Sequence, residues 1–199
     1  MSDSVRYSQL PNLVLAFHGC DQSVYEKVLY DHEPLTPSIK PYDWLGNGIY
    51  FWENSYERAL DWAKEHKSIK TPAVIGAVIE LGHCLNITDY KSTGILKIGY
   101  DLLKLQCELA STKLPVNSNA RANSDLLIRE LDCAVIQQIH QYNKATGKKP
   151  FESVRGVFVE GEPVYPNSGF MEKTHIQLCI INPNCIKGYF SPITASDGK

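Results

Sequence analysis

Short apolar runs, separated by polar stretches rich in glycine and proline, dominate the chain. Strands are predicted where apolar, β-branched and aromatic residues gather over four to eight positions. The ranges that meet this description are residues 13–17, 49–52, 74–79, 154–160, 174–181 and 185–190. Residues 13–17 contain no polar member, which predicts a strand buried on both faces.

Helices are predicted where apolar residues recur at intervals of three and four. A short helix follows Asp21 or Ser23, because either side chain can cap its first turn. A second helix follows Asn54, since asparagine is a favourable N-cap and Glu57 stands at the capping-box position. Between these helices, three prolines in eight residues exclude regular structure over residues 31–41.

Two longer amphipathic patterns, at about residues 98–113 and 124–142, predict a pair of helices between strands of the sheet. A small, polar stretch at residues 115–123 separates them and indicates a loop. We therefore expect a helical insertion over about residues 98–147. Without repeats or a clear boundary, residues 1–199 are expected to form a single α+β domain, a sheet with flanking helices.

Composition narrows the class of protein. The chain has 199 residues, 43% of them hydrophobic, and a net charge of −2, so it can bury a core but lacks a strong attraction for nucleic acid or membranes. Its six cysteines include no Cys-x-x-Cys pair, which argues against zinc or another metal and favours core thiols in a reducing compartment. No secretory signal or run of transmembrane length is visible, so a cytoplasmic location is predicted.

Two glycines, Gly46 and Gly48, stand directly before the aromatic strand predicted at residues 49–52. Glycine accepts positive φ angles and lets another group come close to the backbone. Taken alone, this arrangement is typical of an ordinary turn before a core strand. It becomes informative beside two other stretches, Phe17-His18-Gly19-Cys20 and Thr174-His175-Ile176-Gln177.

In order and in kind, the three stretches resemble the signature of the diphtheria-toxin and poly(ADP-ribose) polymerase branch of the ADP-ribosyltransferase superfamily. Members carry His-Gly at the end of an early strand, then Gly-x-Gly-Ile-Tyr-Phe, and an acidic or substitute residue near the start of a late strand. Here these positions are His18-Gly19, residues 46–51 and Gln177. The resemblance covers about half of the chain and is absent between about residues 85 and 150. It is nearest to small bacterial members with glutamine at the third position, and it implies a split β-sheet core.

The resemblance also implies that NAD is the co-substrate and that two glycines and two aromatic residues surround its nicotinamide. Gly19 and Gly48 would let the ligand approach the main chain. Tyr50 would stack on the nicotinamide ring, and an aromatic residue of the following helix would cover the other side. Trp62 stands closest to the family's spacing, and Tyr56 is the competing residue.

The implied catalytic triad is His18, Tyr50 and Gln177. His18 would hydrogen-bond a ribose hydroxyl in the adenosine half of NAD. Gln177 can accept a hydrogen bond through its carbonyl oxygen but cannot act as a general base, which argues against polymer formation. Glu172 is the nearest carboxylate in the sequence that could supply a base. Weaker candidates are Glu160 and Glu162.

Each of these residues also has a plain structural explanation. A histidine at a strand end is commonly held by its neighbours, and aromatic residues such as Tyr50 and Trp62 commonly belong to a core. Gln177 is also compatible with an ordinary sheet position, and Glu172 with a solvated loop. His175 shares a sheet face with Gln177, so it either lines the site or flanks it.

Two functions remain open on the sequence. The first is a mono-ADP-ribosyltransferase that releases nicotinamide and transfers one ADP-ribose to a protein, nucleic-acid or small-molecule acceptor. By analogy with bacterial members it would be a toxin or effector, with a neutralising partner. The second is a catalytically weak or inactive module that binds NAD or ADP-ribose and acts through partner contacts.

Overall fold

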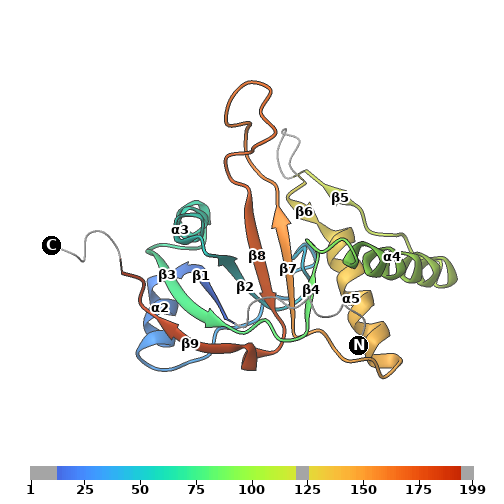
Figure 1. Ribbon diagram of the computed structural model, residues 1–199, viewed down its shortest axis with the longest axis horizontal. Coiled ribbons are helices and arrows are strands. Elements are labelled where there is room, and N and C mark those ends of the chain that lie inside the picture. Colours follow the sequence, from blue (N-terminus) through green and yellow to red (C-terminus); the bar gives the residue numbers. More distant parts are fainter. Residues whose placement is uncertain (1–12, 120–125, 194–199) are drawn as a thin grey trace.

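The computed structural model describes residues 13–119 and 126–193. It shows an α+β protein in which helices cover both faces of one mixed, seven-stranded sheet (Figure 1). The strands of this sheet are β1 (Val14–Asp21), β2 (Ile49–Glu53), β3 (Pro72–Ile79), β4 (Cys84–Asn86), β7 (Ser153–Phe158), β8 (His175–Ile180) and β9 (Ile186–Phe190). The other elements are α2 (Gln22–Leu29), α3 (Tyr56–Glu65), α4 (Ser92–Leu109), the ribbon strands β5 (Asn117–Ser118) and β6 (Ile128–Arg129), α5 (Glu130–Ala145) and a 3₁₀ turn (Pro183–Cys185).

The strand order across the sheet is β4-β7-β8-β2-β1-β3-β9. Neighbouring strands are antiparallel except β4 and β7, which are parallel. Parallel neighbours need a long crossover, and α4 and α5 lie within the connection from β4 to β7. The strands that carry the three sequence motifs, β1, β2 and β8, are therefore adjacent in the middle of the sheet.

Side chains of the central strands alternate between two packed faces, as the pleat of a strand requires. Phe51 and Leu178 point into the core beneath α2, whereas Tyr50 and Cys179 point into a second cluster beneath α5. A third, smaller cluster forms beneath α3 around Trp52. One face of the sheet is thus divided between α3 and α5, and the other is covered by α2 and the segment that follows it.

Most of the predicted strands and helices form, but several details differ. Asp21 caps α2 by accepting the Ser23 N–H, as expected. The predicted capping box before α3 is wrong, because Asn54 adopts a left-handed φ of 51° and the cap residue is Ser55, which makes no side-chain bond to the helix. The prediction of a strand buried on both faces at residues 13–17 is also wrong, since Leu13 and Leu15 are exposed.

The two helices of the expected insertion pack against each other at Gly99, whose missing Cβ would lie 2.5 Å from a side-chain carbon of Ile139. Both are displaced from the predicted ranges, and the predicted start of the second helix at residues 124–125 lies outside the described residues. All six cysteines are free thiols. No helix of the described ranges is long and apolar enough to cross a membrane.

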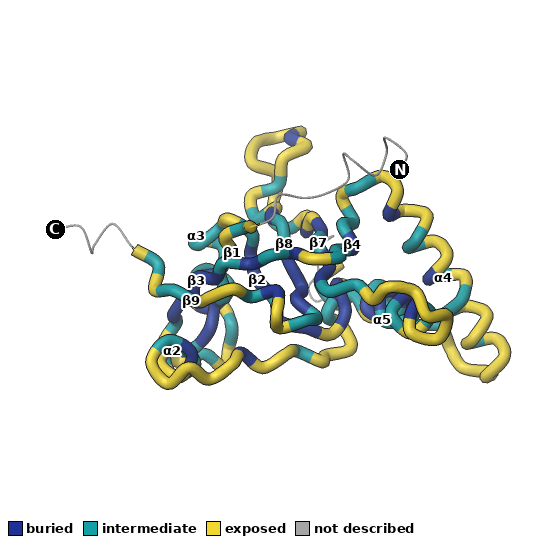
Figure 2. The backbone as a smooth tube through the Cα atoms, turned by 60° about the horizontal axis from the view of Figure 1, so that its bottom comes forward, coloured by how far each residue is buried: buried dark blue, intermediate teal, exposed yellow. Residues whose placement is uncertain are grey.

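A long loop joins β7 to β8 and projects from the end of the sheet (Figure 1). Most of its residues are exposed, in contrast to the buried central strands (Figure 2). Its two ends return to the sheet side by side, where the N–H of Lys173 donates to the carbonyl of Glu160. The loop base therefore stands next to the start of β8, where His175 and Gln177 lie.

Candidate functional site

His18 lies where β1 separates from β2. β1 pairs with β3 from Val14 to Asp21, but its pairing with β2 is limited to Ala16 and Phe17. Beyond that point the His18 ring reaches across, and its Nδ1 lies 2.8 Å from the Tyr50 carbonyl oxygen. Because a carbonyl only accepts, Nδ1 carries the proton and Nε2 is left as an acceptor. Burial lowers the pKa of His18, against the opposing effect of this hydrogen bond, so the ring is neutral at neutral pH.

Tyr50 meets His18 through its main chain and not through its ring. The His18 ring lies 5.7 Å from the Phe51 ring, and consecutive strand residues point to opposite faces. The Tyr50 hydroxyl donates to the carbonyl of Gly46 at 2.8 Å and accepts from the N–H of Leu45 at 3.0 Å. Burial raises the pKa of this phenol, so it stays protonated. The side chain therefore fastens the turn in which Gly46 has a φ of 85°.

Gly19 and Gly48 were expected to leave room for a ligand, but other atoms of the protein lie close to both. A Cβ on Gly19 would lie 2.2 Å from the carbonyl oxygen of Ala59 in α3. A Cβ on Gly48 would lie 2.5 Å from the Cys179 Sγ and 2.7 Å from the Ile180 carbonyl oxygen. Close packing against α3 and β8 is thus sufficient reason for glycine at both positions.

Trp62 and Tyr56 both belong to the part of α3 that covers β1 and β2. The Trp62 ring lies 5.4 Å from the Trp52 ring and 4.7 Å from the His66 ring. Tyr56 makes an edge contact with Phe17, with ring centroids 5.9 Å apart. Both side chains are half-buried. They lie over Trp52 and Phe17, whereas Tyr50 packs beneath α5.

Gln177 is held by Trp44, a residue that the sequence analysis did not single out. The side chain lies on the sheet face of its cross-strand partner Trp52. The indole Nε1 of Trp44 donates to Gln177 Oε1 at 2.6 Å. Because an indole N–H only donates, it fixes the orientation of the amide. Trp44 itself packs over Gly156, where a Cβ would lie 2.5 Å from its ring, and beneath the guanidinium of Arg129, 4.5 Å above the ring.

His175 lies next to Gln177 on the same face and is nearly fully buried. Its Nδ1 lies 2.6 Å from the carbonyl oxygen of Lys173, which places the proton on Nδ1. The ring stacks on Phe158, at 5.5 Å and 25°. Burial is the largest influence on its pKa and lowers it, and the charge of Arg58 acts in the same direction. His175 therefore lines the site as a neutral ring with an unprotonated Nε2.

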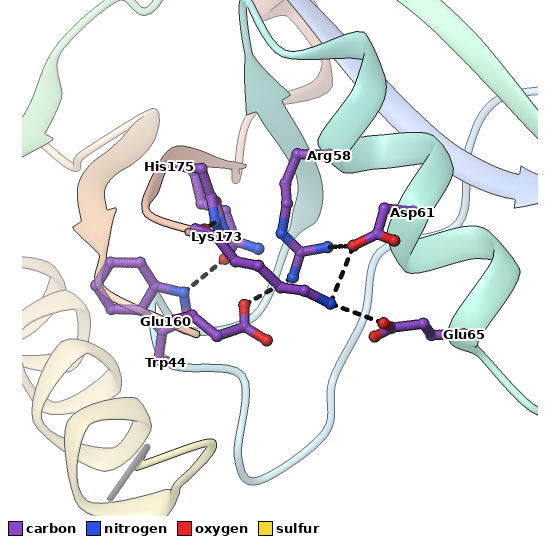
Figure 3. A network of polar contacts seen from close by, with 8 residues as sticks. Trp44, Arg58, Asp61, Glu65, Glu160, Lys173 and His175 are labelled. Carbon is purple, nitrogen blue, oxygen red and sulfur yellow. Dashed lines mark hydrogen bonds and ion pairs between the residues drawn. The ribbon is translucent and has the colours of Figure 1, made fainter. Parts of the chain in front are cut away.

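The three candidate carboxylates lie in different settings. Glu172 and Glu162 are exposed in the projecting loop, where the Glu172 N–H donates to the Glu162 carbonyl. Glu160 is largely buried at the loop base and binds the guanidinium of Arg58 at 2.6 Å (Figure 3). The carboxylate that the structure brings to His175 is thus Glu160, whose charge acts on the pKa of that histidine.

Ion pairs join α3 to the loop base around this point. Arg58 also contacts Asp61 at 3.2 Å, and Lys173 bridges Asp61 and Glu65 at 3.2 and 2.7 Å (Figure 3). The sequence offered no signal for Arg58 or Trp44, because neither stands in a recognisable motif. Their importance comes from contacts over more than one hundred residues of chain, namely Arg58 to Glu160 and Trp44 to Gln177.

Two of the cavities formed by the described residues adjoin α4 and α5. One of about 370 Å³ is lined by Trp44 and Arg129 together with apolar residues of both helices. The other, of about 220 Å³, lies near His83 and Phe151. His18, Tyr50 and Gln177 line neither cavity. Trp44 therefore touches both the 370 Å³ cavity and the Gln177 amide.

Comparison with known proteins gives limited information. No family model matches the chain. It is similar to an uncharacterized protein of the archaeon Methanocaldococcus jannaschii, with 27% identity over 191 residues, covering 86% of this chain and 83% of the relative. That protein's name describes no activity.

Proposed function

We propose that the protein is an NAD-dependent mono-ADP-ribosyltransferase of the diphtheria-toxin and poly(ADP-ribose) polymerase type. The observation that carries the proposal is the adjacency of β1, β2 and β8, which bear the three motif stretches. His18 contacts the main chain of Tyr50, and Gln177 lies opposite Trp52 on the next strand. The three stretches, up to more than 150 positions apart, thus lie on three neighbouring strands, with the His18 ring on the sheet face of Phe51 and Gln177 on the face of Trp52.

The protonation states suit the recognition of ribose hydroxyl groups. His18 donates through Nδ1 to the Tyr50 carbonyl, so its Nε2 is the atom that would accept a hydrogen bond from a hydroxyl of the adenosine ribose. Gln177 accepts from Trp44 through Oε1, so its NH₂ group is free to donate to the ribose that carries nicotinamide. These contacts would hold the two riboses of NAD in a fixed orientation while the bond to nicotinamide breaks.

Transfer of a single ADP-ribose fits this site better than polymer formation. The side chain at position 177 is an amide and cannot take a proton from a growing chain. The acceptor is a protein, nucleic-acid or small-molecule group, and a role as toxin or effector with a neutralising partner belongs to the same proposal.

A binding module is the second candidate, and two contacts favour it. The oxygen of Gln177 is already engaged by Trp44, and the hydroxyl of Tyr50 is engaged by the Gly46 turn. Groups held in this way can shape a pocket for NAD or ADP-ribose without taking part in chemistry. In this case the chain would bind NAD and release no nicotinamide.

Nicotinamide release from NAD by the purified protein tests the proposal, with NAD binding measured in parallel by calorimetry. We expect release that is lost in His18→Ala and Tyr50→Ala. His32→Asn is the matched control, because His32 is exposed and asparagine tolerates its φ of 60°. Saturable binding without release would support the module, and the absence of both would contradict both candidates. Mass spectrometry of acceptors incubated with NAD would then identify the group that gains ADP-ribose.

A further inference from the structure

Three buried polar atoms around β8 have no hydrogen-bond partner among the described residues. They are Trp52 Nε1, Arg58 Nε and His175 Nε2. Trp52 is 3% and His175 8% exposed. A buried polar group without a partner is unfavourable, and native proteins keep few of them. Three in one neighbourhood therefore call for a functional reason.

The three residues come from β2, α3 and β8 and converge on one place. The rings of Trp52 and His175 lie 6.1 Å apart. Arg58 extends from α3 toward the start of β8 (Figure 3), close enough for its charge to act on His175. Its two terminal nitrogens contact Asp61 and Glu160, and Nε is the guanidinium nitrogen without a partner.

The donor and acceptor character of these atoms is fixed. The indole and guanidinium nitrogens, Trp52 Nε1 and Arg58 Nε, can only donate. His175 carries its proton on Nδ1, where the Lys173 carbonyl accepts it. Its Nε2 is therefore an acceptor and a base. One acceptor and two donors complement a hydroxyl group, which donates one hydrogen bond and accepts two.

We propose that Trp52, Arg58 and His175 form the binding site for a hydroxyl-bearing acceptor, with His175 Nε2 as the general base. This rests on the proposed transferase function and names the acceptor class and the base. As nicotinamide leaves with the electron pair of its bond to the ribose, the acceptor oxygen bonds to the same ribose carbon. The hydroxyl proton passes to Nε2 of His175, which later returns it to solvent.

The proposal accounts for an amide at position 177. Gln177 cannot take a proton, and Glu172 is exposed in the loop. His175 stands two residues before Gln177 on the same sheet face, where a base would be close to the ribose that Gln177 is proposed to bind. The base and the ribose-binding group are thus two neighbouring residues of one strand.

Access requires movement of the ion pairs that cover the site. Arg58 and Glu160 close it on one side, and Lys173 joins the loop base to Asp61 and Glu65. Lys173, Asp61 and Glu65 keep a third to a half of their side-chain surface exposed, and exposed pairs are weak. The Lys173 pairs can therefore open when an acceptor arrives, while the buried pair of Arg58 and Glu160 stays in place.

The charges that act on His175 are those of Arg58 from α3, which lowers its pKa, and Glu160 just after β7, which raises it. Asp61 from α3 pairs with Arg58, and Lys173, two residues before His175, pairs with Asp61. Arg129 lies beyond the Phe158 ring, 5.5 Å above it. Burial and the charge of Arg58 lower the pKa of His175 below 6.5. Nicotinamide release should therefore increase as pH rises through that lowered pKa and stay constant at higher pH.

Methanolysis of NAD by the full chain tests the proposal, with methanol as the hydroxyl probe and water as the competing nucleophile. His175→Asn keeps a donor for the Lys173 carbonyl and removes the base. We expect kcat to fall about 100-fold, NAD affinity to stay unchanged and the rise with pH to disappear. The control is His140→Asn, because His140 in α5 also buries an unpartnered Nε2 and should leave kcat unchanged.

Trp52→Phe provides a second variant, because it keeps an aromatic ring and removes only the indole N–H. We expect it to lower kcat for methanolysis about tenfold. If His175→Asn and Trp52→Phe keep the native rate and pH profile, the acceptor site is refuted while the transferase function stands. If the native chain releases no nicotinamide, the transferase function fails and this inference fails with it.

Discussion

The indole nitrogen of Trp44 lies 2.6 Å from Oε1 of Gln177, and this hydrogen bond joins the loop before β2 to the middle of β8. Trp44 is itself held from two sides, by Gly156 below its ring and Arg129 above it. The amide of Gln177 therefore cannot turn over without losing a short bond to a fixed partner. The bond sets which group of Gln177, oxygen or NH₂, faces the proposed ribose.

The first prediction concerns this orientation. Gln177→Glu would let one carboxylate oxygen accept from Trp44 while the other faces the ribose as a negative charge, which favours the oxocarbenium-like state. We expect nicotinamide release to rise about tenfold. In a Trp44→Phe background the carboxylate loses its fixed orientation, so the gain should be much smaller. The kcat values of the four proteins form a double-mutant cycle that measures the coupling.

An equal gain in both backgrounds would mean that Trp44 does not position residue 177. No gain in either would mean that the side chain does not face the ribose, and the transferase proposal would lose its third residue. Trp44→Phe alone should lower the free energy of unfolding by about 1 kcal/mol, the usual contribution of a hydrogen bond.

The second prediction concerns Gly19. A Cβ there would meet the main-chain oxygen of Ala59 at 2.2 Å, and a main-chain atom cannot move without shifting α3. Gly19→Ala should therefore lower the free energy of unfolding by about 1–3 kcal/mol, the usual cost of overpacking. Urea unfolding followed by circular dichroism measures the change.

Gly94→Ala is the matched control, because Gly94 is exposed in α4 and a Cβ there meets no atom within 4 Å. Alanine favours helix, so this variant should gain up to about 1 kcal/mol. If Gly19→Ala kept full stability but lost NAD binding, the glycine would serve the ligand and not the packing of α3.

Local patterns were sufficient for the elements of the fold. Buried strands such as residues 74–79 are continuous apolar runs, and α2 follows a recognisable cap at Asp21. Where the sequence analysis failed, a long-range contact decided the outcome. Leu13 and Leu15 were predicted to be buried but are exposed, because a run of apolar residues does not show whether both faces are covered at the start of β1.

Only the motif residues of the candidate site could be predicted from the sequence. The motifs contain His18, Tyr50 and Gln177, but nothing in them indicates that the Tyr50 hydroxyl bonds to the Gly46 turn. Trp44 and Arg58 contact the site because strand register and packing bring remote segments of the chain together. A local sequence motif does not show such contacts.

The third prediction concerns Arg155 of β7, which binds Glu53 of β2 across β8. Its Nε and one terminal nitrogen contact the two carboxylate oxygens at 2.6 and 2.8 Å. The two side chains are only 13% and 17% exposed. Arg155→Met leaves the Glu53 charge partly buried without its partner, so we expect a loss of about 2–3 kcal/mol of stability in urea unfolding.

Adding Glu53→Gln to Arg155→Met should recover part of that loss, because the unpaired charge is removed. Lys97→Met is the control for the effect of an ion pair alone. Lys97 pairs with Asp101 on α4, where the side chains are 70% and 54% exposed, so its loss should cost less than about 0.5 kcal/mol. Equal losses at both pairs would contradict the importance assigned to burial.

The fourth prediction concerns pH and follows from buried histidines. Burial lowers the pKa of His18, His140 and His175 below the ordinary value of 6.5. Between the lowered pKa values and 6.5, the unfolded chain binds more protons than the folded one, so stability is complete above pH 6.5 and falls as pH decreases. The urea midpoint should therefore drop between pH 8 and pH 5. His140→Leu should reduce that drop and His32→Asn should not. A midpoint that stayed constant across this range would show that the three rings accept protons as readily in the fold as in water.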